Sequence, residues 1–292
     1  MDFSTDFALG LEILLALVVY YCLARFALDS RFDALVALAA KPTAVPTDGA
    51  DVPLSQSEDR DSVTLITLSD SASAATATTF ARLRKDRIRA RAWLLSLVVS
   101  AVLSLLGAAY AASILDVFTS TGGSAKAAYA LLRQRDAVGR VLTIGFMSFC
   151  AADLAIGYVD YRSQVSFLDG WLHHLVYFGT LAVFLREGYD GVFAYFGLCE
   201  LPTFMLALGS VYKPWRIDLP MGIIFFATRI VYFGGVVMVI AINEHISFRS
   251  TLGSALMCLH VYWFVGWIKS YRRLRATRSG DYLSSSREER VP

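Results

Sequence analysis

The feature that most constrains this chain is a series of apolar blocks, each about 20 residues long, separated by shorter polar segments. An α-helix rises about 1.5 Å per residue, so one such block matches the roughly 30 Å hydrocarbon core of a bilayer. Inside that core every backbone N–H and C=O group must be bonded within its own segment, which requires helices. The pattern therefore predicts an all-α, polytopic integral membrane protein.

Seven blocks qualify as membrane-spanning helices of such a bundle. The composition agrees, because 56% of the 292 residues are hydrophobic and only 18% are charged, against roughly 25% charged residues in soluble domains. We expect the spans at Phe7–Leu28, Trp93–Ile114, Gly139–Val159, Asp169–Leu185, Asp190–Gly209, Leu219–Ala241 and Thr251–Ile268.

Two clusters of basic residues predict the orientation of the bundle. One occupies residues 82–91, before the second span, and the other occupies residues 269–278, after the last span. Loops rich in Lys and Arg stay in the cytosol, and the six spans between the clusters return the chain to its starting side. We therefore predict a luminal N-terminus and a cytosolic C-terminus. We interpret both clusters as orientation signals rather than as sites for nucleic acid or lipid headgroups.

Composition also divides the chain into segments. Residues 1–40 form a retained transmembrane anchor, since the acidic start is unlike the basic start of a signal peptide. Residues 41–80 contain three prolines and a Ser/Thr/Ala-rich run, which predicts a disordered cytosolic linker. Residues 81–275 hold six spans and form the main domain, and residues 276–292 are expected to be a disordered cytosolic tail.

The fourth span carries two adjacent histidines, His173 and His174. An ionisable side chain at membrane depth is costly, so it indicates a functional site. Counting from the span boundaries places Asp153 and His173 at similar depth in the cytosolic leaflet. Asp169 precedes His173 by four residues, shares its helical face and could orient the ring. His173, His174 and Asp153 are the catalytic candidates; the alternative is that the histidines only form hydrogen bonds between helices.

A second polar set lies in the fifth and sixth spans. Glu200 and Arg229 each fall near the centre of a span, and a short loop makes these two spans antiparallel neighbours. We predict an ion pair, which either holds the two helices together or contacts a substrate. Pro202 lacks an N–H and is expected to kink the fifth span beside Glu200. The expected cavity-lining residues are Asp169, Glu200, Pro202, Thr203 and Arg229.

The sequence offers no pattern typical of a metal site. Adjacent histidines on a helix cannot easily chelate one ion, and no His-x-x-x-His spacing occurs. No metal and no cofactor are therefore predicted. His245 and His260 are expected to be incidental. Cysteines are the other possible metal ligands. All four lie within apolar blocks, and we expect them to be buried, reduced thiols: Cys22, Cys150, Cys199 and Cys258.

Four short segments together resemble the TLC family, named for TRAM, Lag and CLN proteins. They are Gly145–Asp153, Asp169–His174, Glu200–Thr203 and Thr228–Val231, and the resemblance covers residues 82–275. The family includes ceramide synthases, which transfer a fatty acyl group from acyl-CoA to the amine of a sphingoid base. Other members are associated with membrane lipid composition or with protein handling at the endoplasmic reticulum.

The resemblance implies an endoplasmic reticulum protein of lipid metabolism or membrane lipid homeostasis, with membrane lipids as partners and a homo-oligomer as a possible state. One alternative is an acyl-CoA-dependent N-acyltransferase, with acyl-CoA as co-substrate, His173 or His174 as general base and Asp153 or Asp169 orienting it. A second alternative is a non-catalytic membrane chaperone or cargo receptor. Ceramide synthases carry an aspartate pair downstream of their histidines, whereas this chain has Glu200-Leu-Pro-Thr203 there. It therefore looks closer to the TLC-domain branch than to the synthases.

Overall fold

The computed structural model describes residues 3–39, 61–189 and 191–288, and every secondary-structure element within these ranges is helical. This confirms the predicted all-α class. The elements are α1 (Phe3–Ala39), α2 (Asp61–Ala92), α3 (Leu94–Ser120), α4 (Ala125–Leu132), α5 (Ala137–Asp160), η1 (Arg162–Gln164), η2 (Phe167–Leu172), α6 (His173–Glu187), α7 (Val192–Phe196), η3 (Gly197–Glu200), α8 (Leu201–Val211), η4 (Lys213–Trp215), α9 (Asp218–Phe225), η5 (Phe226–Tyr232), α10 (Phe233–Glu244) and α11 (Phe248–Glu288).

Within the described ranges, six helical segments are long and apolar enough to cross a membrane, which confirms a polytopic helical bundle. The fourth predicted span, Asp169–Leu185, is not among these six. This segment is helical, but its two histidines and Asp169 lower its hydropathy. The six are Ser4–Leu38, Leu94–Ser120, Ala137–Asp160, Val192–Val211, Asp218–Glu244 and Phe248–Ala276.

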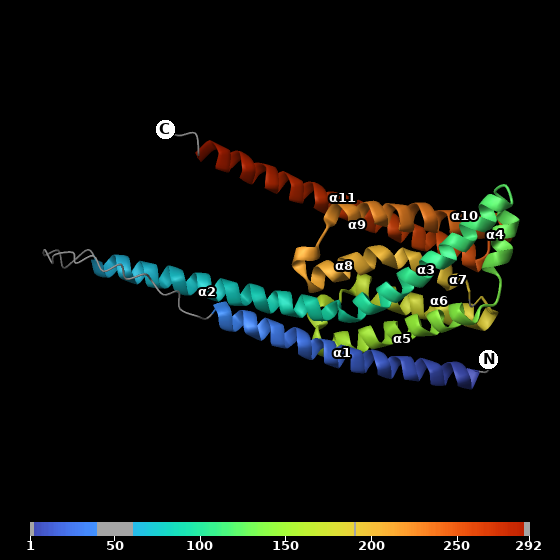
Figure 1. Cartoon of the computed structure of the whole chain (residues 1–292), viewed down its shortest axis with the longest axis horizontal. Coiled ribbons are helices and arrows are strands. Elements are labelled where there is room, and N and C mark those ends of the chain that lie inside the picture. The colour runs from blue at the N-terminus through green and yellow to red at the C-terminus, as the bar shows by residue number, and fades with distance from the viewer. Residues whose placement is uncertain (1–2, 40–60, 190, 289–292) are drawn as a thin grey trace.

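The helices lie roughly side by side, and the ends of the bundle differ (Figure 1). The N-terminus of α1 lies at the same end of the bundle as α4 and the junction of α10 with α11. From the opposite end project the first half of α2 and the C-terminal part of α11. The two basic clusters therefore lie at the same end of the bundle.

Helix α1, which falls within the predicted N-terminal transmembrane anchor, packs against the rest of the bundle. It extends beyond the predicted Phe7–Leu28 and packs along α5 and α2. Polar contacts fix its register, because Ser148 Oγ donates to the Gly10 carbonyl at 2.9 Å and Arg140 Nε donates to Asp6 Oδ1 at 2.9 Å. Close polar contacts of this kind hold helices together in lipid, where apolar burial supplies little driving force.

Two predicted disordered segments are partly helical. Within the expected linker 41–80, α2 begins at Asp61, whereas residues 41–60 lie outside the described residues. Within the expected tail 276–292, α11 continues to Glu288. Alanine has the highest helix propensity, and the Ala-rich run 72–81 leads directly into the basic part of α2, so the helix can continue through it.

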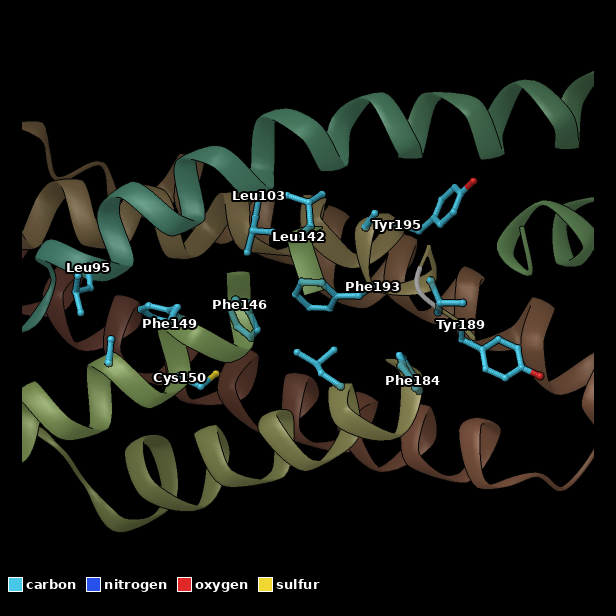
Figure 2. Close-up of a cluster of buried hydrophobic side chains, with 14 of the residues drawn as sticks. Leu95, Leu103, Leu142, Phe146, Phe149, Cys150, Phe184, Tyr189, Phe193 and Tyr195 are labelled. Atoms are coloured by element: carbon cyan, nitrogen blue, oxygen red, sulfur yellow. The ribbon is translucent and has the colours of Figure 1, made fainter. Parts of the chain in front are cut away.

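A cluster of aromatic side chains fills the space between α3, α5, α6 and α7 (Figure 2). At its centre the rings of Phe146 and Phe193 lie 5.0 Å apart, and Phe149 lies 5.3 Å from Phe146. Figure 2 shows Phe149 and Cys150 on α5 at one side of this cluster and Tyr189 at the other. The aromatic cluster fixes the face of α5 that carries Asp153.

Helix α3 makes an unusually close approach to the 3₁₀ turn η3. A Cβ atom added at Gly107 would overlap the backbone of Gly197 and Leu198, and one added at Gly197 would lie 2.7 Å from the Leu103 carbonyl oxygen. Small residues allow two backbones in a membrane bundle to touch. This contact fixes the turn that ends at Glu200.

Candidate functional site

The paired histidines follow a π-helical turn. η2 covers Phe167–Leu172, and α6 begins directly at His173. Single π-turns are rare and occur frequently at functional sites, because the extra residue redirects neighbouring side chains. The backbone of Asp169 belongs to this turn, but its side chain lies outside the part of the chain that the structure describes. The predicted role of Asp169 beside His173 is therefore left as a prediction.

His174 faces Asp153 across the contact between α6 and α5. Its Nδ1 lies 3.5 Å from Asp153 Oδ2, and its ring meets Phe149 edge-on. The other carboxylate oxygen, Oδ1, accepts a hydrogen bond of 2.6 Å from the Tyr161 hydroxyl. Burial raises the pKa of the Tyr161 hydroxyl well above its ordinary value, so this group stays protonated and donates.

His173 points toward a different neighbour, the last helix. Its ring lies 4.6 Å from that of Tyr177 and 5.3 Å from that of Trp263 in α11. Among the described residues, the only buried side-chain nitrogen or oxygen atoms without a hydrogen-bond partner are the Nδ1 atoms of His173 and His174. An unpaired buried polar atom costs free energy, so a polar ligand group beside His173 Nδ1 would be favourable, whereas His174 Nδ1 has Asp153 as its nearest charged neighbour.

The predicted ion pair between Glu200 and Arg229 is present. Arg229 Nη2 lies 3.1 Å from Glu200 Oε1 and donates to Thr203 Oγ1 at 2.7 Å. Arg229 Nε donates to the Cys199 carbonyl at 2.7 Å. One guanidinium thus joins three acceptors on the neighbouring span, the arrangement that its planar fork of donors allows.

The helical geometry of the fifth span changes directly before Pro202, where a kink was predicted. The chain runs from α7 through the 3₁₀ turn η3 into α8, which begins with Leu201 and Pro202. The Leu198 carbonyl accepts a hydrogen bond from the N–H of Leu201. Pro202 could not donate this bond, because it has no N–H. The change to 3₁₀ geometry lies beside Cys199, whose carbonyl accepts from Arg229.

His260 was expected to be incidental, and that expectation is wrong. Its side chain is only 2% exposed, and its Nδ1 lies 3.2 Å from the Arg229 carbonyl oxygen. Because a carbonyl oxygen only accepts, Nδ1 carries the proton. Arg229 lies in the π-helical segment η5, where the bonding pattern differs from an α-helix. His260 therefore supports the backbone that carries Arg229.

The two polar sets meet at one cavity of about 330 Å³. It extends from the start of α3 to the loop after α5. The predicted residues that line it are Asp153, His173, His174, Glu200, Thr203 and Arg229. Pro202 lines an adjoining cavity of about 460 Å³, to which Thr203 and Arg229 also contribute.

Several residues of the site gave no signal in the sequence. Tyr161 and Trp93 line the cavity, and Trp263 packs against His173. Tyrosine and tryptophan near the ends of spans are common as interfacial anchors, which conceals a role inside the bundle. These three residues are identified only by contacts between helices that are far apart in the sequence.

The cysteines take no part in the cavity. All four are free thiols, with Cys150 and Cys199 buried and Cys22 and Cys258 exposed on the outer surface of the bundle, contrary to the expectation of burial. Cys199 Sγ lies 3.4 Å from the Thr228 carbonyl and so packs next to Arg229. In the part of the chain that the structure describes, no group of three or more His, Cys, Asp or Glu side chains has the geometry of a metal site.

Comparison with known proteins gave no match to a family model, to a curated protein or to a solved structure.

Proposed function

We propose that this membrane protein binds a lipid whose polar group enters the cavity between α3, α5, α6, α8 and η5, and that it acts in lipid metabolism or membrane lipid homeostasis as a member of the TLC family. The observation that carries the proposal is the cavity itself. It lies within apolar helices yet is lined by acidic, basic and imidazole side chains. Polar residues at membrane depth typically mark a substrate or ion pathway.

The charges of the cavity favour an amphiphile with a polar head of mixed character. Arg229 can donate to an acyl or phosphoryl oxygen, whereas Asp153 and Glu200 can accept from hydroxyl or amino groups. Both kinds of group occur in lipid headgroups and backbones. The adjoining cavity is lined mainly by apolar and aromatic side chains and could hold part of a hydrocarbon chain.

Mass spectrometry of the purified protein tests this proposal. The protein is extracted in a mild detergent, and the lipids that remain bound after exhaustive washing are identified. We expect one lipid class to be enriched over the bulk membrane, and we expect Arg229→Gln together with Glu200→Gln to abolish that enrichment. Tyr158→Phe, on the outer face of α5, serves as the control. Bound lipids of bulk composition in the unchanged protein would contradict a specific lipid site.

The approach of His174 to Asp153 favours a second candidate, an acyl-CoA-dependent N-acyltransferase. A carboxylate beside Nδ1 favours a proton on that atom and leaves a lone pair on Nε2. Nε2 would take the proton of an attacking amine as its nitrogen bonds to the thioester carbon. As the C–S bond breaks, the same proton would pass to the departing CoA thiolate.

Release of free CoA tests the second candidate. The protein in lipid nanodiscs is given a long-chain acyl-CoA and a panel of long-chain amines. We expect CoA release that depends on the amine and that falls at least 100-fold in His174→Ala, as for loss of a general base. Release at the level of the His173→Ala, His174→Ala double variant would exclude acyl transfer to these amines. The lipid-binding proposal would still stand on its own test.

The proposal also includes a location and an orientation. We propose the endoplasmic reticulum membrane, with the end of the bundle that bears both basic clusters in the cytosol. Supporting this, residues 82–91 and 269–276 lie at that end and follow the positive-inside rule. The cavity reaches the loop after α5 at the same end, so a ligand could approach from the cytosol.

A further inference from the structure

Tyr161 lies at the wall of the cavity and directly contacts one of its charged groups. It follows the last residue of α5, is 2% exposed and donates to Asp153 Oδ1 at 2.6 Å. The opposite oxygen of the same carboxylate, Oδ2, is the one closest to His174 Nδ1. By holding Oδ1, Tyr161 therefore fixes the rotation of the Asp153 carboxylate that turns Oδ2 toward His174.

The ring of Tyr161 fits against a gap in α5. A Cβ atom added at Gly157 would lie 3.0 Å from the Tyr161 ring and 2.7 Å from Val165. The absence of a side chain at Gly157 thus leaves room for the Tyr161 ring, whose hydroxyl reaches Asp153. On the other side, the ring of Tyr21 from α1 lies 6.2 Å away at a tilt.

The residue before Tyr161 is held by two other helices. Asp160 accepts a hydrogen bond from the Tyr21 hydroxyl, and its Oδ1 lies 3.2 Å from Arg25 Nη1 and 3.3 Å from Arg91 Nη1. Arg91 also donates twice to Asp29, at 2.6 and 3.0 Å. We call Asp160 with these three contacting residues the Asp160 clamp: Tyr21 and Arg25 of α1 and Arg91 of α2.

We propose that Tyr161 is a positioning residue that orients Asp153 toward His174, and that the N-terminal helix α1 serves the site by fixing Tyr161 through the Asp160 clamp. The inference deepens the proposed function and rests on it for the importance of His174. The clamp holds the end of α5 in place, Gly157 seats the ring, and the hydroxyl fixes the carboxylate. Deleting α1 would therefore alter the site without removing any residue that lines the cavity.

The chemical state of His174 gives a readout of this positioning. Because Asp153 Oδ2 lies 3.5 Å from Nδ1, we expect the neutral imidazole to favour a proton on Nδ1. Without the Tyr161 hydroxyl, the carboxylate can rotate away, and the two tautomers approach equal population. A hydrogen bond to a charged group is worth enough to change such a two-state ratio about tenfold.

The experiment is nitrogen NMR of the full chain, labelled at histidine and held in lipid nanodiscs. The chain has only four histidines, so a His174→Gln sample assigns the signal of interest. At a pH where the ring is neutral, we expect the unchanged protein to show His174 mainly protonated on Nδ1. We expect Tyr161→Phe to reduce that preference about tenfold.

Two further variants separate positioning from general damage. Tyr158→Phe removes a hydroxyl three residues earlier on the exposed face of α5, so its His174 signal should match that of the unchanged protein. Tyr21→Phe weakens the Asp160 clamp from α1 and should shift the tautomer ratio in the same direction by a smaller amount. It also tests the proposal if Tyr161→Phe fails to fold.

The outcomes distinguish this inference from the proposed function. An unchanged His174 tautomer in folded Tyr161→Phe overturns the positioning role, even if a specific lipid remains bound. An unchanged tautomer in Tyr21→Phe overturns the part played by α1. A tautomer shift in both variants, combined with no specific lipid in the unchanged protein, supports positioning and removes the proposed lipid function.

Discussion

The two polar groups of the cavity differ in how completely their atoms are bonded. In the first, Arg229 donates to three acceptors on the neighbouring span, and His260 approaches its backbone carbonyl. In the second, His173 and His174 each leave a buried Nδ1 without a hydrogen-bond partner, and His174 approaches Asp153 only to 3.5 Å. Both line the same cavity.

The difference indicates separate roles for the two groups. A buried charge that is fully bonded can hold helices together, and its loss is expensive because its partners remain buried. Buried atoms that lack partners contribute little to folding, and they gain most when a ligand arrives. Under the proposed function, we therefore expect the Arg229 group to hold the bundle as well as to line the ligand cavity, and we expect the histidine group to contribute mainly to ligand binding.

The largest expected effect comes from breaking the ion pair. Arg229→Leu leaves Glu200 buried without its partner and should destabilise the protein by about 3–5 kcal/mol. The double variant with Glu200→Leu should be more stable than Arg229→Leu alone, because no unpaired charge remains. Thermal unfolding in detergent measures both. Losses that simply add would contradict the assignment of Arg229 and Glu200 as a pair.

A smaller loss is expected where α3 touches η3. Gly107→Ala forces a methyl group into the backbone of Gly197 and Leu198, which should cost about 3 kcal/mol. It should also loosen the turn that carries Glu200 and leave the histidines in place. Gly235→Ala in α10 is the matched control, since a Cβ atom there meets nothing within 4 Å. Equal unfolding temperatures for the two variants would show that the close approach does not matter.

The smallest expected effect is a gain in stability rather than a loss. His173→Phe keeps ring contacts with Tyr177 and Trp263 and removes one unpaired buried nitrogen. We expect it to stabilise the protein by about 1 kcal/mol and to weaken retention of the bound lipid. Unfolding temperature and lipid mass spectrometry on the same sample measure both. A clear loss of stability would show that His173 helps to hold the bundle together, as the Arg229 group does.

Much of the site can be predicted from the sequence, because the depth of a residue in the membrane follows from its position along a predicted span. Spans have a fixed rise per residue, so the matching depth of Glu200 and Arg229 and the short loop between their helices predict their contact. The same count places Asp153 level with the histidines. These predictions depend only on length, hydropathy and loop size.

The remaining features depend on rotation and on contacts between distant helices. Counting could not show that His174 rather than His173 approaches Asp153, because the π-turn before them alters the helical phase. Tyr161 follows α5 and reaches back to Asp153, and His260 of α11 contacts the Arg229 carbonyl in η5; nothing local in the sequence marks either residue. The Asp160 clamp requires α1 to dock on α5, which hydropathy alone does not encode.

The π-helical segment η5 has a consequence for how such a site can change over time. A π-turn holds one residue more than an α-helical turn, and the helices on either side keep their faces. Losing a single codon within Phe226–Tyr232 would let the segment close as an ordinary α-helix, while α9 and α10 still cross the membrane. Arg229 would then be displaced by a deletion rather than by substitution. Descendants of this chain could gain or lose the cation by changes in length that leave the apolar faces intact.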